Sequence, residues 1–178
     1  MTTSSMVAVQ AGTARRLDFG DVVRTHQSMV FSLVYHFLHD REVAEEVAQD
    51  VFLSLHRHLE RIQSPEHAGF WLRKVAVQRA IDEARRKKRR PQVALELVAE
   101  PSVSASPGDP LLSEVLRRLV ATLAEGPRAV VILRYQEDLD PAEIADILEM
   151  PLGTVKSHLQ RSLSLLREKL ERRGVGEI

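Results

Sequence analysis

The sequence predicts an all-α fold, with two small helical domains joined by a flexible linker. Three observations predict it. Apolar residues recur at helical spacing while strand-like alternation is scarce, proline follows a capping or turn residue at four positions, and one proline-rich stretch interrupts the apolar pattern. Since 44% of the 178 residues are hydrophobic, the chain has enough apolar side chains to form a core.

Two long helices are expected first, over about 21–38 and 41–60, because neither Gly nor Pro occurs from Asp21 to Ser64. The second of these helices carries an apolar stripe with a spacing of four residues: Val43, Val47, Val51, Leu55 and Leu59. Four later helices should begin with proline at the first helical position, at Ser64-Pro65, Asp109-Pro110, Gly126-Pro127 and Asp140-Pro141.

Four prolines and a Ser/Ala/Gly run between Pro91 and Pro110 are typical of a linker. We therefore expect a disordered tail over 1–17, a first domain over 18–90, a linker over 91–110, a second domain over 111–172 and a frayed tail over 173–178.

The net charge of zero hides a segregation of charge along the chain. Residues 18–63 hold four basic and eight acidic side chains, a balance of −4, whereas residues 64–90 hold nine basic and three acidic ones, a balance of +6. Segregation of this kind indicates surfaces for different partners.

The C-terminal pattern predicts a helix–turn–helix: a helix from Pro141 to Glu149, a turn through Pro151 and Gly153, and a second helix from Thr154. Glu143 completes an acidic capping box with Asp140 at the start of the first helix. The second helix presents polar groups suited to phosphates and base edges: Thr154, Lys156, Ser157, His158, Gln160 and Arg161. The alternative is a solvated face on an ordinary helical hairpin.

A basic block, Arg73–Arg90, continues the helix after Phe70-Trp71-Leu72 and ends in six consecutive basic residues. Such charge suits a phosphate backbone, and the aromatic residues before it favour nucleic acid. A solvated helix end or a localisation tract are the alternatives, and Trp71 is more simply explained as a core residue. Leu53, which lies among carboxylates on the acidic helix, indicates either a docking surface or a solitary exposed leucine.

Several classes of function are disfavoured. The absence of cysteine removes disulfides and thiolate metal sites. The histidine pairs His36/His39 and His56/His58 lack an obvious third ligand, so we expect no metal, no cofactor and no catalytic site. The longest charge-free stretch, His26–His39, is too short to span a bilayer, and residues 1–16 lack a secretion signal, so a cytoplasmic protein is expected.

Three stretches resemble the extracytoplasmic-function class (group 4) of bacterial sigma factors, in the sigma-70 family: AEEVAQDVF (Ala44–Phe52), FWLRKVAVQRAIDEARR (Phe70–Arg86) and the block Arg128–Arg161. The resemblance implies a non-catalytic factor that binds core RNA polymerase, at the β′ clamp and the β flap, and directs it to promoter DNA. An anti-sigma factor is a further partner that the family implies.

The resemblance also assigns roles to individual residues. Docking on the polymerase would fall to Glu42, Glu46, Gln49, Asp50 and Leu53. Recognition and melting of the −10 element would fall to Ile62, Trp71, Arg73, Lys74, Gln78, Arg79, Asp82, Arg85 and Arg86. The polar face of the helix from Thr154 would bind the −35 element.

Four positions depart from the family pattern. Gln78 stands where Asn is usual, and Ile62 stands where many members have an aromatic residue. The usual Leu-Pro of the second domain is Leu123-Ala124, and His56 replaces a common Trp or Tyr. Two rival functions remain open at this point. One is a stand-alone regulator that binds duplex DNA without polymerase, and the other is a histidine-dependent metallohydrolase.

Overall fold

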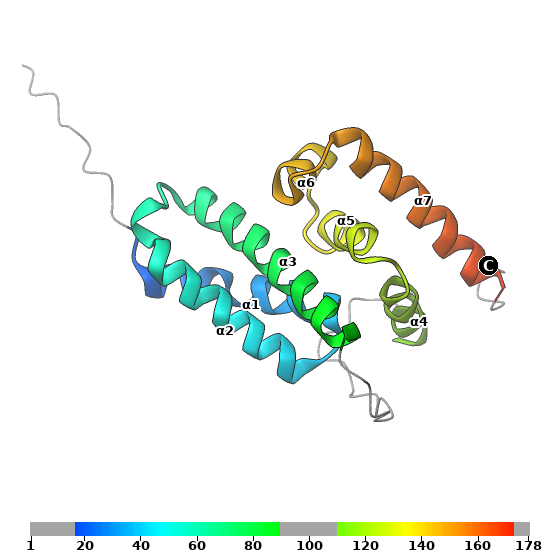
Figure 1. The fold of residues 1–178 in the computed structure, drawn as a ribbon, viewed down its shortest axis with the longest axis horizontal. Coiled ribbons are helices and arrows are strands. Elements are labelled where there is room, and N and C mark those ends of the chain that lie inside the picture. The colour runs from blue at the N-terminus through cyan, green and yellow to red at the C-terminus, as the bar shows by residue number, and fades with distance from the viewer. Residues whose placement is uncertain (1–16, 90–109, 173–178) are drawn as a thin grey trace, which may run out of the picture.

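The computed structural model describes residues 17–89 and 110–172, and every regular element within these ranges is helical (Figure 1). The all-α prediction is confirmed. Apart from Leu17 and Pro110, the predicted tails and linker lie outside the described residues. No helix in the described ranges is long and apolar enough to cross a membrane.

The first half consists of α1 (Phe19–Leu38), α2 (Arg41–His58), a 3₁₀ turn (Leu59–Arg61) and α3 (Pro65–Arg89). Both early helices begin at an aspartate. The Asp18 carboxylate accepts a hydrogen bond from the Asp21 amide at 2.9 Å, and the Asp40 carboxylate accepts one from the Val43 amide at 3.3 Å. Each such cap satisfies a backbone donor that has no intrahelical partner and stabilises its helix by about 1 kcal/mol.

These three helices pack together through their apolar stripes. Val47, Val51 and Leu55 of the predicted stripe on α2 are buried, whereas its outer members Val43 and Leu59 are partly buried. Alanines on α3 let this helix approach α1 and α2 closely; they are Ala68, Ala76, Ala80 and Ala84. The result is a compact bundle in which α2 and α3 each keep one face in solvent.

The second half consists of α4 (Pro110–Ala121), α5 (Glu125–Tyr135), α6 (Pro141–Leu148) and α7 (Leu152–Glu171). The predicted capping box is present at α6: the Asp140 carboxylate accepts from the Glu143 amide at 2.9 Å, and the Glu143 carboxylate accepts from the Asp140 amide at 2.8 Å. Glu149 closes α6 in the left-handed region at φ 52°.

Two predicted starts in this half were wrong by two residues. α5 begins at Glu125, so Pro127 is its third residue. Proline is tolerated there because the first-turn amides have no intrahelical acceptor to lose. Likewise α7 begins at Leu152, and Gly153, expected in the turn, is helical.

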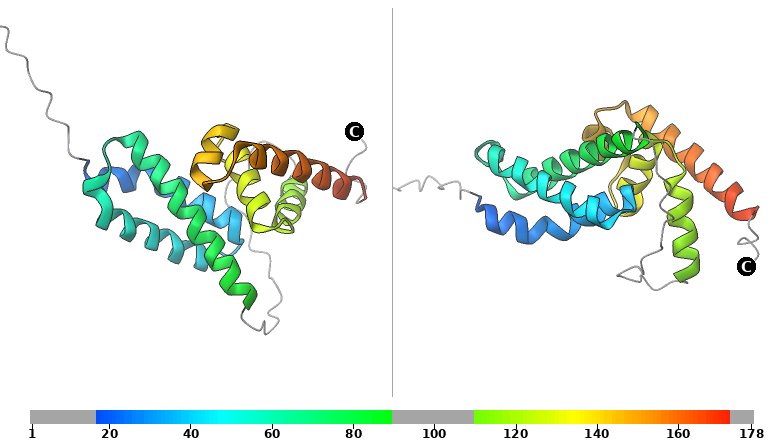
Figure 2. Two further views of the ribbon diagram at one scale, coloured as in Figure 1. Left: turned by 45° about the horizontal axis from the view of Figure 1, so that its top comes forward. Right: turned by 60° about the horizontal axis from the view of Figure 1, so that its bottom comes forward.

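The two halves pack against each other, which the sequence does not predict. α4 and α5 contact α1, and α5 and α6 contact α3. Figure 2 shows the two halves from two further sides. One cluster of buried apolar side chains continues from Leu33 and Phe37 on α1 into Ile132 and Leu133 on α5. Packing at this boundary determines which parts of α3 face solvent.

Candidate functional site

The second helix of the helix–turn–helix, α7, lies on the outside of the second half (Figure 1) and carries the expected polar face. Lys156, Gln160 and Arg161 are exposed, and the other expected residues are partly buried: Thr154, Ser157 and His158. The opposite face is apolar, with Val155 and Leu166 buried against the rest of this half. An amphipathic helix with an open polar face has the shape and chemistry required to enter a DNA groove.

The basic helix α3 is exposed along its C-terminal half, where Arg85, Arg86, Lys87, Lys88 and Arg89 all lie in solvent. Many of its cations are paired with carboxylates of the same chain. Within the first half, Arg79 Nη1 lies 3.3 Å from Asp50 Oδ2 on α2, and Lys87 Nζ lies 3.2 Å from Asp40 Oδ2. Exposed pairs of this kind contribute little to stability, so a polyanion can displace the carboxylates.

A polar groove lies between α2 and α3, with a volume of about 480 Å³. It brings together residues expected in two different roles, Glu46 and Asp50 for docking, and Gln78, Arg79 and Asp82 for −10 DNA. Gln78 and Asp82 are exposed. Their amide and carboxylate groups offer both donors and acceptors to the edge of an unpaired base.

Two residues assigned to −10 recognition are buried or partly buried. Ile62 follows the 3₁₀ turn and enters the core with 8% of its surface exposed, so its side chain is not offered to a base. Trp71 is partly buried and packs against the core, with its ring 5.7 Å from that of His58. Phe70, the other aromatic residue before the basic block, is more exposed than Trp71.

The expected docking face is on the outer side of α2. Glu42, Glu46, Gln49, Asp50 and Leu53 are all exposed there, and Leu53 at 56% is among the most exposed large apolar side chains that the structure describes.

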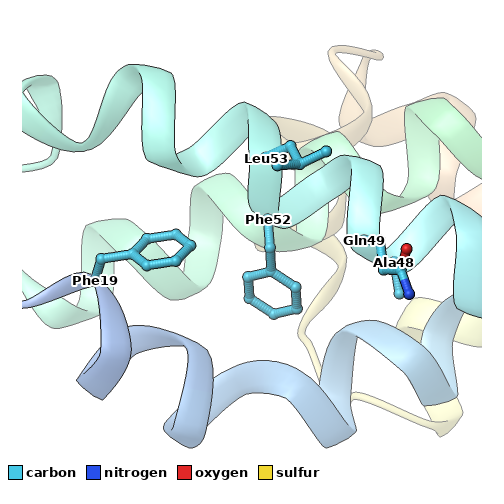
Figure 3. A pocket seen from close by; sticks show the side chains of 5 residues that line it. All are labelled: Phe19, Ala48, Gln49, Phe52 and Leu53. Atoms are coloured by element: carbon cyan, nitrogen blue, oxygen red, sulfur yellow. The ribbon is translucent and has the colours of Figure 1, made fainter.

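Beside Leu53 is an apolar hollow of about 320 Å³ between α1 and α2, lined by Phe19, Ala48, Gln49, Phe52 and Leu53 (Figure 3). Phe19 reaches across from α1 toward Phe52 on α2. Sequence reasoning missed Phe19 and Phe52. The sequence shows that Phe19 directly follows the Asp18 cap, but this position does not reveal that the Phe19 ring on α1 and the Phe52 ring on α2 line the same hollow.

The histidine pairs do not converge on a common point. His56 packs edge-on against Phe19 at 5.1 Å, whereas His58 faces Trp71. His36 and His39 lie where α1 meets the second half, and burial lowers the pKa of both; for His39, reinforced by His36 and Arg128, the pKa falls to about 4. Among the described residues there is no group of three potential His, Cys, Asp or Glu ligands.

Two family models match the chain in order. Residues 22–90 match Sigma-70 region 2, and residues 113–166 match Sigma-70, region 4. Among curated proteins, the RNA polymerase sigma-E factor of Streptomyces avermitilis is 31% identical over 157 residues, which cover 88% of this chain and 87% of that protein. The ECF RNA polymerase sigma factor SigW of Bacillus subtilis is 26% identical, with coverage of 85% and 88%.

Solved structures share the fold at low identity. The sigma factor RpoE of Bartonella quintana, solved in complex with the anti-sigma factor NepR, superposes with a TM-score of 0.72 at 18% identity, over 86% of this chain and 97% of that one. CnrH, solved in complex with the cytosolic domain of CnrY, gives 0.62 at 19% identity, over 86% and 88%.

Proposed function

The chain belongs to the sigma-70 family, in its extracytoplasmic-function class, and we propose how its helices divide the work of directing RNA polymerase to promoters. The function itself follows from the family: such a chain binds core RNA polymerase and directs promoter-specific initiation of transcription. One observation carries the proposal: the chain has three chemically different faces, an acidic face with an apolar edge on α2, a basic face on α3 and a polar face on α7, and the first two meet at the groove between α2 and α3.

In this proposal the domains are residues 18–90 and 111–172. The outer face of α2 docks on the polymerase, with Leu53 and the hollow beside it receiving an apolar side chain of the β′ clamp. A leucine rimmed by carboxylates suits a partner that is apolar at its centre and basic at its edge. The second half contacts the β flap.

The DNA-facing surfaces are α3 and α7. Arginines and lysines of α3 bind phosphates near the −10 element, and the polar groove at Gln78 holds an unstacked base. The exposed Lys156, Gln160 and Arg161 of α7 read the −35 element. The chain performs no covalent chemistry in this scheme and acts in the cytoplasm, with the polymerase. An anti-sigma factor is a further proposed partner, since the Bartonella relative was solved with such a protein.

In vitro transcription with core polymerase on a promoter library tests the function, and Arg161→Ala tests the role of α7. Removing a guanidinium that contacts a base edge costs about 1–3 kcal/mol, so −35-dependent transcripts should fall roughly tenfold while core binding is unchanged. Arg167→Ala is the matched control, because Arg167 is exposed on another face of the same helix. Equal loss in the two variants contradicts the role of Arg161. Tight duplex binding without polymerase, and no promoter-dependent transcripts with it, would instead support a stand-alone regulator.

A further inference from the structure

Gly153, the second residue of α7, is a glycine that the fold does not require. Its backbone is helical, and a Cβ added to it would meet nothing within 4 Å. At Gly69 on α3, in contrast, an added Cβ would lie 3.3 Å from the side chains of Arg73 and His26. Glycine is the poorest helix former after proline, because it loses the most backbone entropy. Neither packing nor backbone conformation therefore explains a glycine at this position.

The place of Gly153 on the surface of α7 indicates a contact outside the chain. With about 100° of rotation per residue, Gly153 lies about 160° round the helix from the buried Val155. Gln160, about two turns later, lies within about 20° of the same line along the helix. The polar face proposed to meet −35 DNA therefore begins with a residue that has no side chain. In helix–turn–helix proteins, the N-terminal residues of this helix are the ones that contact DNA most closely.

Lys156 places a positive charge beside this bare stretch of backbone. It follows Gly153 by three residues, so the two are neighbours on the helix surface. Lys156 is exposed and forms no ion pair with a carboxylate of the described residues. The N-cap of α7 is Pro151, and no side chain of the described ranges caps the first turn, whereas Asp140 caps α6. An anion beside Gly153 would therefore meet both backbone N–H groups and an ammonium group.

From these observations we infer that Gly153 is the close-approach position of the −35 interface, where a phosphate of the DNA backbone lies against the first turn of α7 in the space that a Cβ would take. The inference rests on the proposed role of α7 in −35 recognition. A side chain on a helix points toward the N-terminal end, so a methyl group at Gly153 would project over the amides that face the phosphate. The Lys156 ammonium binds the same phosphate from the side.

This role gives Gly153→Ala opposite effects on folding and on DNA binding. Alanine is the better helix former and the space for its methyl group is empty, so the Tm of the variant should be no lower than that of the wild type. The methyl group should separate the phosphate from the backbone amides. The affinity of the holoenzyme for promoter DNA should therefore fall roughly tenfold, the loss expected for one charge-assisted hydrogen bond.

Gly126→Ala is the matched control. Gly126 is the second residue of α5, and the N-cap of that helix, Ala124, likewise provides no side-chain cap. An added Cβ would lie 3.8 Å from His158 Nε2, which is an ordinary contact distance. Because Gly126 is not on the polar face of α7, this variant should keep its Tm and bind promoter DNA as tightly as the wild type.

The test uses holoenzyme assembled from core polymerase and the full-length chain, and it measures binding to a promoter fragment by fluorescence anisotropy. A series of fragments carries one uncharged methylphosphonate at each phosphate of the −35 element in turn. One such replacement should weaken binding of the wild type but should have little further effect on Gly153→Ala, because the contact is already lost. Lys156→Ala should reduce the sensitivity at the same phosphate.

Three results would overturn the inference. The first is equal promoter affinity of Gly153→Ala and Gly126→Ala. The second is an unchanged pattern of phosphate sensitivity in Gly153→Ala. The third is a lower Tm of Gly153→Ala together with weaker binding, because the glycine would then serve the fold.

A fragment without the −35 element separates the inference from the proposed function. If the wild-type holoenzyme prefers the fragment with the −35 element, and Gly153→Ala shows the same preference with the same affinity, the close-approach role fails alone. If the wild-type holoenzyme shows no such preference, the proposed role of α7 fails, and the role of Gly153 fails with it.

Discussion

Arg128 on α5 ties three segments together, and its replacement by methionine should destabilise the whole chain. Its guanidinium donates to the carbonyl oxygens of Phe37 at 3.1 Å, of Leu123 at 2.9 Å and of Ala121. Its carbon Cζ also lies 5.2 Å from the centre of the Phe37 ring. Since Phe37 belongs to α1, Ala121 ends α4 and Leu123 lies just after it, one side chain connects both halves.

The magnitude follows from these contacts. A hydrogen bond from a charged donor contributes about 1.5–3 kcal/mol when buried, and about 1 kcal/mol each is appropriate here because Arg128 is only half-buried. Burial of the charge offsets part of the sum: desolvation lowers the pKa of Arg128, and its Nε has no hydrogen-bond partner among the described residues. The net loss on Arg128→Met should be about 2–3 kcal/mol, or roughly 5–10 °C in Tm.

Thermal unfolding followed by circular dichroism measures this loss. Arg118→Met is the control, because Arg118 is exposed and pairs with Glu114 one turn away; its effect should stay within about 0.5 kcal/mol. Arg128→Lys should fall in between, since lysine keeps the charge but not the planar fork of donors. A decrease for Arg128→Met no larger than that for Arg118→Met would refute the role assigned to this side chain.

The remaining predictions concern docking, pH and helix propensity. Leu53→Asp should weaken the binding of core polymerase at least tenfold in a pull-down or anisotropy assay. Gln27→Asp is the control, because it adds the same charge at an exposed site on α1, and it should leave the affinity unchanged. Equal affinities of the two variants would show that the α2 face does not dock on the polymerase. Acid should destabilise the fold through His39, whose pKa is 6.5 in the unfolded chain and about 4 in the folded protein. Because the unfolded chain therefore binds more protons below neutrality, about 2 kcal/mol of stability should be lost between pH 7 and pH 5. His39→Asn, which suits the left-handed backbone at φ 53°, should remove that part of the pH dependence in denaturant titrations, and an unaltered profile would contradict the assignment. Gly153→Ala should raise stability by up to about 1 kcal/mol, because Gly153 is helical and an added Cβ meets nothing within 4 Å; a decrease in Tm would show that the site needs glycine.

Local chemistry was sufficient to predict most helix ends. The pairs Ser64-Pro65 and Asp140-Pro141 mark the starts of α3 and α6 because a cap and a preset φ act within one turn. The same rule gave the wrong start at Pro127, because proline fits any position of the first turn and nothing local distinguishes the first from the third.

Contacts between halves were beyond the reach of the same reasoning. Arg73 meets a carboxylate 64 residues away, and Lys74 meets one 75 residues away. Neither helical periodicity nor net charge per segment determines which of many acidic residues lies opposite a given cation. For the same reason the burial of Ile62, which the resemblance assigned to −10 recognition, was not predicted: it depends on how the 3₁₀ turn enters the core, and the stripe on α2 does not fix that entry.

The tie at Arg128 has a consequence for biosynthesis. Translation proceeds from the N-terminus, so α1, α2 and α3 leave the ribosome before α5 has been made. Until then, the Phe37 ring and the carbonyl at the end of α1 lack the guanidinium that covers them in the finished protein. During this interval the nascent first half exposes the apolar surface around Phe37 to water and to chaperones, and this surface becomes buried once α5 has been made.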